Sequence, residues 1–301
     1  MALSDFAILD PRFRRLVVAS ATVRRLFTGC AWAEGPAYVP AYRLLIWSDT
    51  PNDRMLAYNE REGSVTLFRE PAGYSNGNCL DREGRLITCQ HGFRSVTRTE
   101  HDGSVITLAD RLGDKRFNSP NDVVCKSDGT IWFSDPTYGI DSDYEGHKAP
   151  SEIAASWLFR LDMDGTIEAV VTDFVQPNGL AFPPDERLLY VADTGASHIV
   201  DGPRHIRRFV VGDDNQLTDD GIFATCSNGV FDGFRLDSAG RIWASAADGV
   251  HCYDPDGTLL GKILVPERVA NVCFGGPKRN VLYICATTSL YAITLPVNGA
   301  N

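Results

Sequence analysis

One short motif occurs six times along this chain, and it constrains the fold more than any other feature. Each copy begins with an acidic or amide residue, followed by an apolar strand, a turn and a second apolar strand; the third copy runs from Asn121 through Asp128-Gly129 to Asp135. The six first residues, called anchors below, are Glu34, Asn76, Asn121, Asn178, Asp232 and Asn271. Successive anchors are 42, 45, 57, 54 and 39 residues apart. Repeats of this length, each with several short strands, are typical of β-propeller blades.

The segments between these repeats supply two further strands for each blade. Asp-Gly dipeptides separate apolar strands at 102–103, 164–165 and 256–257, and such dipeptides favour tight hairpin turns. The sequence therefore predicts an all-β fold, a six-bladed β-propeller with four-stranded antiparallel blades. A length of 301 residues would by itself suggest two domains, but a closed repeat array can use this length in one. Residues 1–301 are therefore expected to form a single propeller domain.

Three segments lie outside the repeat pattern. Residues 1–30 precede the first anchor and are expected to pair in part with the last blade, because a propeller leaves no free sheet edge only when its ends meet. Residues 137–153 are rich in Asp, Ser, Gly and Pro, and they are predicted to form a surface loop that acts as a lid. Residues 194–207 are predicted to form a second rim loop.

The charge balance argues against two classes of partner. The formal net charge is −10, whereas nucleic acids and anionic membranes bind cationic surfaces. No apolar stretch is long enough to span a membrane, and the N-terminus is too charged for a secretory signal. A cytoplasmic location is therefore expected. The alternative is a transit peptide, which the stretch from Arg12 to Arg25 weakly resembles. The eight cysteines show no metal-site spacing and are expected to be reduced and buried. Both a monomer and a homodimer stay open.

The anchors carry chemistry of their own. Equivalent positions of a repeat should occupy equivalent places around the ring, so six carboxylate and amide side chains should face the axis at one rim. Oxygen donors without His or Cys suit Ca²⁺ or Mg²⁺, and less well Mn²⁺ or Zn²⁺. Alternatively, the anchors are Asx-turns that only close hairpins. The metal interpretation is favoured because Glu34-Gly35-Pro36 and Asn121-Asp122 are not hairpin-turn dipeptides, and because two converging carboxylates repel one another without a cation.

Other candidate residues are less specific. His91 and His251 follow predicted inner strands and could face the axis, although an isolated His is more often a hydrogen-bonded structural residue. The sequence contains no Gly-x-Ser-x-Gly motif, and none of its cysteines stands out as a nucleophile. Covalent catalysis is therefore not indicated.

Seven stretches spread over nearly the whole chain form a characteristic set. They are Trp32-Ala33-Glu34-Gly35-Pro36, Arg116-Phe117-Asn118-Ser119-Pro120-Asn121-Asp122-Val123-Val124, Ser134-Asp135-Pro136-Thr137-Tyr138-Gly139, Gln176-Pro177-Asn178-Gly179-Leu180-Ala181-Phe182, Tyr190-Val191-Ala192-Asp193-Thr194, Asp232-Gly233-Phe234-Arg235-Leu236-Asp237 and Phe274-Gly275-Gly276-Pro277. Together they resemble the SMP-30/gluconolactonase/luciferin-regenerating family of six-bladed propellers, in particular its bacterial gluconolactonase branch. The resemblance implies one divalent cation with Glu34, Asn121, Asn178 and Asp232 as ligands, and Asp232 also as proton donor and acceptor. In one departure, Phe231 precedes Asp232 where the family commonly has proline, which bears on the local turn and on substrate fit.

The resemblance further implies hydrolysis of a sugar lactone, such as the aldono-1,5-lactone gluconolactone, to its aldonate. The cation, Ca²⁺ first with Mg²⁺, Mn²⁺ or Zn²⁺ as alternatives, would polarise the lactone carbonyl and lower the pKa of a water, while Asp232 takes and returns the proton. The residues expected to contact the substrate are Asn121, Asn76, Tyr138 and His91. Two other hypotheses stay open: an organophosphate or aryl-ester hydrolase that uses the same cation, and a non-catalytic Ca²⁺-binding propeller.

Overall fold

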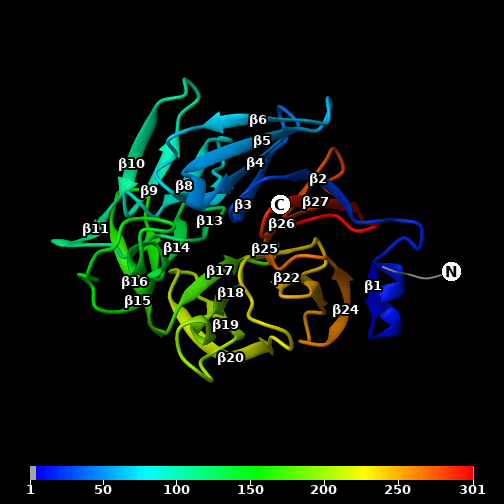
Figure 1. The fold of residues 1–301 in the computed structure, drawn as a ribbon. Coiled ribbons are helices and arrows are strands. Elements are labelled where there is room, and N and C mark those ends of the chain that lie inside the picture. Colours follow the sequence, from blue (N-terminus) through cyan, green and yellow to red (C-terminus); the bar gives the residue numbers. More distant parts are fainter. Residues whose placement is uncertain (1–4, 301) are drawn as a thin grey trace.

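The structure is a computed structural model and describes residues 5–300. Six antiparallel sheets surround a central axis like the blades of a propeller (Figure 1). The innermost strands of the sheets are β3 (Ala33–Val39), β7 (Ser75–Leu80), β13 (Val123–Cys125), β17 (Pro177–Ala181), β21 (Phe234–Leu236) and β25 (Val269–Gly275). Each of them contacts the next in this order, and β25 contacts β3, so the ring is closed. The predicted six-bladed β-propeller is confirmed.

Each blade adds further strands outward from its innermost one. In the first three blades these strands are β4 (Leu44–Asp49), β5 (Arg54–Asn59) and β6 (Ser64–Arg69), then β8 (Leu86–Gln90), β9 (Ser95–Thr99) and β10 (Val105–Ala109), then β14 (Ile131–Asp135), β15 (Ser156–Leu161) and β16 (Ile167–Phe174). In the last three they are β18 (Leu188–Asp193), β19 (His205–Val211) and β20 (Leu217–Thr225), then β22 (Ile242–Ala246), β23 (Gly249–Tyr253) and β24 (Leu259–Leu264), then β26 (Val281–Ala286) and β27 (Ser289–Thr294). A small separate hairpin consists of β11 (Arg111–Leu112) and β12 (Lys115–Arg116).

Burial is lower in the outer strands than in the inner part of the first blade. Every residue of β3 is buried, whereas no residue of β6 is. Inner strands lie between neighbouring blades, so even their polar residues are withdrawn from water, as Asn76 and Asn78 of β7 are.

The N-terminal segment contributes a strand to each of the last two blades. β2 (Arg24–Thr28) pairs antiparallel with β27, so the fourth strand of the sixth blade comes from the start of the chain. β1 (Phe6–Ile8) pairs with β24 and extends the fifth blade to five strands, and the short 3-10 helix η1 (Pro11–Arg15) follows it (Figure 1). Pairing the two ends of the chain in one sheet removes the free edges that an open ring would expose.

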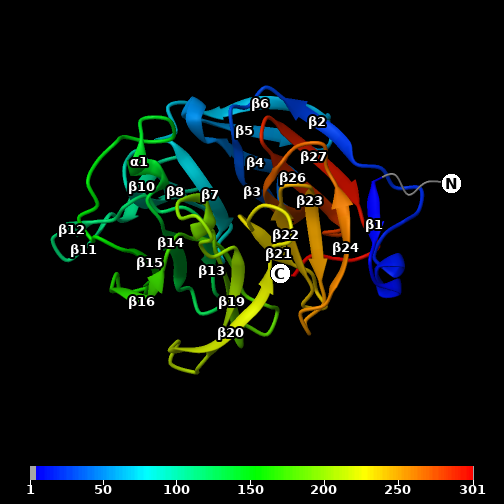
Figure 2. The same cartoon turned by 60° about the horizontal axis from the view of Figure 1, so that its bottom comes forward.

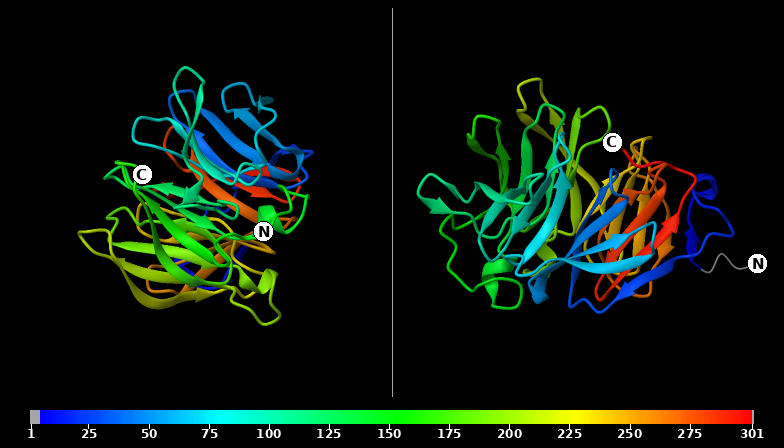
Figure 3. Two further views of the ribbon diagram at one scale, coloured as in Figure 1. Left: turned by 90° about the vertical axis from the view of Figure 1, so that its left-hand side faces the viewer. Right: turned by 90° about the horizontal axis from the view of Figure 1, so that it is seen from above.

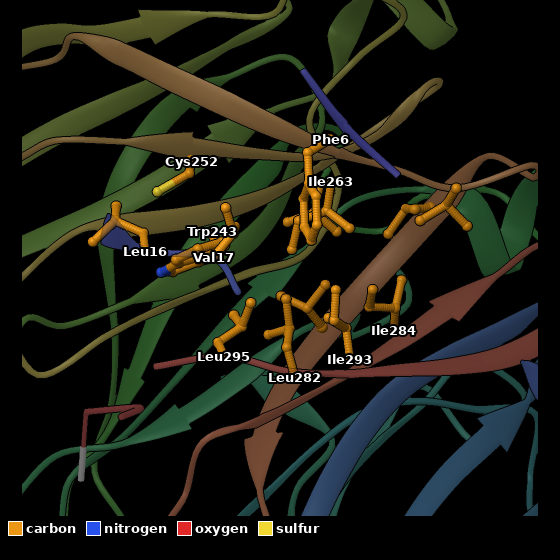
Figure 4. Packing of buried hydrophobic residues seen from close by; sticks show 14 of the residues in the cluster. Phe6, Leu16, Val17, Trp243, Cys252, Ile263, Leu282, Ile284, Ile293 and Leu295 are labelled. Carbon is orange, nitrogen blue, oxygen red and sulfur yellow. The ribbon is translucent and has the colours of Figure 1, made fainter. Parts of the chain in front are cut away.

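Apolar side chains of this segment extend the core between blades five and six. Figure 4 shows Phe6, Leu16 and Val17 packed with residues of those two blades. Their labelled partners are Trp243, Cys252, Ile263, Leu282, Ile284, Ile293 and Leu295. Burying each large apolar side chain contributes about 2 kcal/mol, so the segment is an integral part of the packing.

Two loops project from the third and fourth blades and contact one another. The first, between β14 and β15, contains the short helix α1 (Tyr138–Asp141), and the second contains the 3-10 turn η3 (Gly195–Ser197). A further 3-10 turn, η2 (Thr50–Asn52), follows β4. The Tyr138 hydroxyl lies 2.9 Å from Ser197 Oγ, and His198 Nε2 lies 2.7 Å from Asp141 Oδ2. Loops are expected from the sequence in both places, and a single helical turn is too short to show a helical period.

The two faces of the ring differ in what covers them. Helix α1 lies over blades two and three, where Gly139 packs on the side chains of His91 and Ser119 (Figure 2). The C-terminus lies at the opposite face from α1 (Figure 3, right), and there Ala300 N donates to Leu236 O at the end of β21.

Among the described residues, no helix is long and apolar enough to cross a membrane. All eight cysteines carry free thiols, five of them buried and Cys79, Cys125 and Cys273 half-buried.

An aspartate at the end of the second strand positions three of the anchors. The Asp135 carboxylate accepts hydrogen bonds from the backbone nitrogens of Asn118 and Ser119, both at 2.8 Å. The same arrangement recurs in blades one and four, where Asp49 accepts from Ala31 and Trp32 and Asp193 accepts from Val175 and Gln176. These segments lead directly into Glu34, Asn121 and Asn178. In the sequence these aspartates follow their anchors by 15, 14 and 15 residues, and the shared hydrogen bonds explain why this distance is nearly constant.

Candidate functional site

The anchors lie next to one another around one rim because a glycine follows four of them. The backbone nitrogen of Gly77 donates to Asn121 O at 2.7 Å, and that of Gly179 donates to Asp232 O at 3.1 Å. A Cβ added to Gly77 would lie 2.4 Å from Asn121 O, and one added to Gly179 would lie 2.3 Å from Asp232 O. No side chain fits at that distance, so glycine is required for each blade to approach the next.

The same close approach joins the first blade to the second and the fifth to the sixth. A Cβ on Gly35 would lie 2.0 Å from Asn76 O, and one on Gly233 would lie 2.0 Å from Asn271 Cγ. Gly35 also has φ +51°, a backbone conformation that side chains disfavour. The Asn-Gly and Asp-Gly dipeptides at the anchors thus serve contacts between blades rather than hairpin turns.

Each residue that the sequence singled out has a defined place. Glu34 lies in β3, Asn76 in β7 and Asn178 in β17. Asn121 and Asp232 each lie two residues before a strand, β13 and β21, while His91 follows β8 and Tyr138 begins α1. All of them are buried except Asp232 and Tyr138, which are half-buried. His251 is different: it lies in β23, the third strand of its blade, where Nε2 contacts Asp248 Oδ1 at 2.7 Å. It does not follow an inner strand.

The two anchor carboxylates act on one another electrostatically. Burial raises the pKa of Glu34 to about 7, and the charges of Asp122 and Glu145 add to this rise. Burial also raises the pKa of Asp232 well above its usual range, and Glu34 is the largest charge that adds to it. Two carboxylates that disfavour each other's ionisation in a buried place create a site that gains from a cation.

Hydrogen bonds hold the Glu34 carboxylate and the Asp232 backbone in place. Glu34 Oε2 accepts from its neighbour Gly35 N at 2.8 Å and from Asn271 Nδ2 at 3.2 Å. Asp232 N donates to Ser245 Oγ at 2.9 Å, which fixes the backbone at the start of β21. Asn271 was recognised in the sequence as an anchor, and its role here is to orient Glu34.

Aromatic side chains orient the two anchor amides nearest the loops. Asn121 Nδ2 lies 3.5 Å from His91 Nε2, and since an amide nitrogen only donates, Nε2 accepts and Nδ1 carries the proton. That Nδ1 lies 3.0 Å from the backbone oxygen of Glu145. Burial lowers the pKa of His91 to about 4, in agreement with a neutral ring. On the other side, Tyr138 is hydrogen-bonded to Ser197 and Asn178, while burial raises its pKa.

The oxygen atoms of this rim fit a hard divalent cation. The Oδ1 atom of Asn76 is buried and has no hydrogen-bond partner among the described residues. In the described part of the chain no three His, Cys, Asp or Glu side chains group closely enough to hold a metal. An ion bound here would therefore depend on amide oxygens beside the carboxylates of Glu34 and Asp232, a donor set that suits Ca²⁺ or Mg²⁺.

Sequence reasoning missed three charged residues near the anchors. Asp122 follows Asn121 and is fully buried; its two carboxylate oxygens lie 3.2 and 3.3 Å from the guanidinium nitrogens of Arg235. This ion pair joins blade three to blade five. The third residue, Glu145, lies in the loop after α1. The dipeptide Asn121-Asp122 could have drawn attention to Asp122, but nothing in the pattern marks Glu145.

Comparisons with known proteins identify the family of this chain. The model of the SMP-30/Gluconolactonase/LRE-like region matches residues 32–288. A gluconolactonase of Zymomonas mobilis is 28% identical over 96% of this chain and 86% of its own length, and pentonolactonase XacC of Haloferax volcanii is 30% identical over 87% and 84%. The solved structure of a gluconolactonase from Xanthomonas campestris is 35% identical with a TM-score of 0.90, covering 97% of this chain and 95% of that one. The chain belongs to the SMP-30/gluconolactonase/LRE-like family.

Proposed function

We propose that this protein hydrolyses a sugar lactone of the aldono-1,5-lactone type, such as gluconolactone, to the aldonate. The observation that carries the proposal is that Glu34 and Asp232 lie beside a rim of amides, where the charge of Glu34 adds to burial in raising the pKa of Asp232. The proposal is further supported by relatives of nearly the same length, whose names are gluconolactonase and pentonolactonase.

The proposal includes one divalent cation, Ca²⁺ first and Mg²⁺, Mn²⁺ or Zn²⁺ as alternatives, held by Glu34, Asn121, Asn178 and Asp232. When bound, such a cation polarises a carbonyl oxygen and makes water more acidic. Its presence would offset the repulsion between the two carboxylates. The orientation of the Asn121 amide supports this set, because its donor nitrogen already serves His91. Its oxygen atom remains available to a ligand.

Side chains of the rim carry out proton transfer and substrate binding. Asp232 takes the proton of the attacking water and returns it to the ring oxygen as the bond between that oxygen and the carbonyl carbon breaks. The anchors Asn76 and Asn121 and the neighbouring Tyr138 supply polar contacts for the hydroxyl groups of the substrate. The sequence also suggested His91 for this role, but both of its ring nitrogens are engaged with Asn121 and the Glu145 carbonyl, so it acts by positioning Asn121. Glu34 is held by Asn271 and does not itself transfer a proton.

A metal analysis combined with a pH-drop assay tests this proposal. The purified protein, before and after treatment with a chelator, is assayed on glucono-1,5-lactone, phenyl acetate and a phosphofluoridate. We expect fastest turnover of the lactone, loss of that turnover on chelation and its return with added Ca²⁺. Faster turnover of the ester or the phosphofluoridate would favour a different hydrolase. Undiminished lactone hydrolysis by metal-stripped protein would exclude the cation from the reaction.

A further inference from the structure

Glu145 is brought toward the anchors by a loop that is otherwise exposed. Its neighbours Tyr144 and His147 are exposed, whereas 23% of the Glu145 side chain remains accessible. The loop is held by close packing of Gly146 on Gly139, where an added Cβ would lie 2.1 Å from Gly139 O, and by the hydrogen bond from His147 N to Gly139 O at 3.0 Å. These two contacts therefore fix the position of Glu145.

A second contact fixes the backbone of Glu145 against blade two. Its carbonyl oxygen accepts a hydrogen bond from His91 Nδ1 at 3.0 Å, and His91 is completely buried. Because the other ring nitrogen of His91 faces Asn121, one imidazole links the loop to an anchor. A displacement of this loop would thus disturb the anchor as well.

The carboxylate of Glu145 accepts no hydrogen bond from the described residues. Its nearest ring nitrogen, His91 Nδ1, lies 3.8 Å from Oε2, and the proton on that nitrogen already serves the Glu145 carbonyl. Within the described chain no Lys or Arg pairs with it, and no group there donates a hydrogen bond to it. Burying most of a carboxylate without a hydrogen-bond donor destabilises the folded protein. A ligand that donates hydrogen bonds would supply the missing donor.

The charge of Glu145 acts on the same space as the anchors. It contributes to the raised pKa values of Glu34, Asp232 and Tyr138. One divalent cation would compensate the two anchor carboxylates, and Asp122 is compensated by its pair with Arg235. Of the described carboxylates that act on Asp232, Glu145 is the one left without such compensation.

We propose that Glu145 contacts the substrate and makes the site selective for neutral polyhydroxylated lactones over lactones that carry an anionic group such as phosphate. This inference rests on the proposed lactone hydrolysis. The carboxylate accepts hydrogen bonds from substrate hydroxyls and repels an anionic substituent. Arg268 acts on Asp232 in the opposite direction to Glu145: it is exposed, and its positive charge lowers the pKa of Asp232 in part.

The test compares D-glucono-1,5-lactone with its 6-phosphate at pH 7.5 in Ca²⁺-loaded protein. The variants are Glu145→Gln and the matched control Asp143→Asn. Asp143 lies in the same loop, is exposed, and accepts a hydrogen bond from Lys148 N that an Asn can also accept. A second measurement, independent of turnover, is calorimetric binding of 1,5-anhydro-D-glucitol and of its 6-phosphate.

We expect the wild-type protein to prefer the neutral lactone by about tenfold in kcat/KM, and Glu145→Gln to remove most of that preference, as expected for loss of one nearby like charge. Glu145→Gln should also raise KM for the neutral lactone severalfold, whereas Asp143→Asn should behave as wild type. An unchanged preference in Glu145→Gln, an equal change in Asp143→Asn, or a wild-type preference for the phosphate would each overturn the inference. If neither lactone is hydrolysed, the proposed function fails, and the two binding measurements still decide the role of Glu145.

Discussion

The side-chain amide of Asn271 donates to the Glu34 carboxylate at 3.2 Å and so joins the last innermost strand of the ring to the first. The two residues are 237 positions apart in the chain. The amide oxygen of Asn271 accepts from Val272 N at 2.9 Å, so neither end of the side chain is free to rotate. Closure of the propeller and orientation of a proposed cation ligand thus depend on the same amide.

Replacement of Asn271 by Ala should weaken Ca²⁺ binding by about tenfold, because a residue that orients a metal ligand commonly contributes that much. Isothermal titration with Ca²⁺ measures it. Asn215→Gly is the matched control, since Asn215 also donates an amide hydrogen bond to a carboxylate of the neighbouring blade, Asp128, but on the exposed surface. Equal affinities of Asn271→Ala and wild type would show that Glu34 does not need this partner.

Glu34→Gln and Asp232→Asn should each reduce lactone turnover by at least about a hundredfold, because each removes a carboxylate that the proposed mechanism needs. Both should remain folded, since an uncharged amide is easier to bury than a carboxylate. Initial rates and thermal unfolding of the metal-free proteins measure the two effects. A variant that keeps turnover within a few-fold of wild type would place the reaction elsewhere.

The buried ion pair between Asp122 and Arg235 should show strong coupling in unfolding experiments. Asp122→Asn or Arg235→Met alone should lower the free energy of unfolding by about 3 kcal/mol, because each leaves its partner buried without a countercharge. The double variant should lose less than the sum of the two single losses. Urea unfolding of the four proteins gives the coupling. Strict additivity would mean that the pair contributes nothing beyond packing.

Glu145 should make the metal-free protein less stable as the pH rises. Its pKa in the folded protein is about 7, raised by burial and then by Asp141, against 4.5 for an ordinary Glu. The folded state therefore binds the proton more tightly, and the stabilisation is present below pH 4.5 and is lost as the pH rises through 7. The groups that face Glu145 are His91, Asp141, Glu34, Asp232 and Tyr138.

Glu145→Gln does not titrate, so it should match wild type at pH 4 and exceed its free energy of unfolding by about 1–2 kcal/mol at pH 8, a value reduced for the partial exposure of the side chain. Chemical unfolding at both pH values measures the difference. Asp143→Asn, in the same loop, should show none. A difference that is the same at both pH values would exclude titration of Glu145 as its cause.

Local pattern was sufficient to predict the ring and the six anchors. Each blade repeats an anchor, a strand, a turn and a second strand, and these are encoded by neighbouring residues through alternation, turn chemistry and spacing. The family motifs lie on the same stretches, because Asp49, Asp135 and Asp193 fix the backbone just before three anchors. At these three anchors, the regular spacing in the sequence corresponds to the same position in each blade.

By itself, then, the sequence determined that this chain is a six-bladed propeller with oxygen-bearing side chains at the start of each innermost strand. Only the tertiary structure decided which groups meet them: the amide of Asn271 at Glu34, the pair of Asp122 with Arg235, the approach of Glu145 through His91, and the pairing of β1 with the fifth blade. These contacts join residues far apart in the chain through irregular loops and packed side chains. No repeat or periodicity encodes these contacts. They form between polar groups that still lack hydrogen-bond partners after the blades have closed.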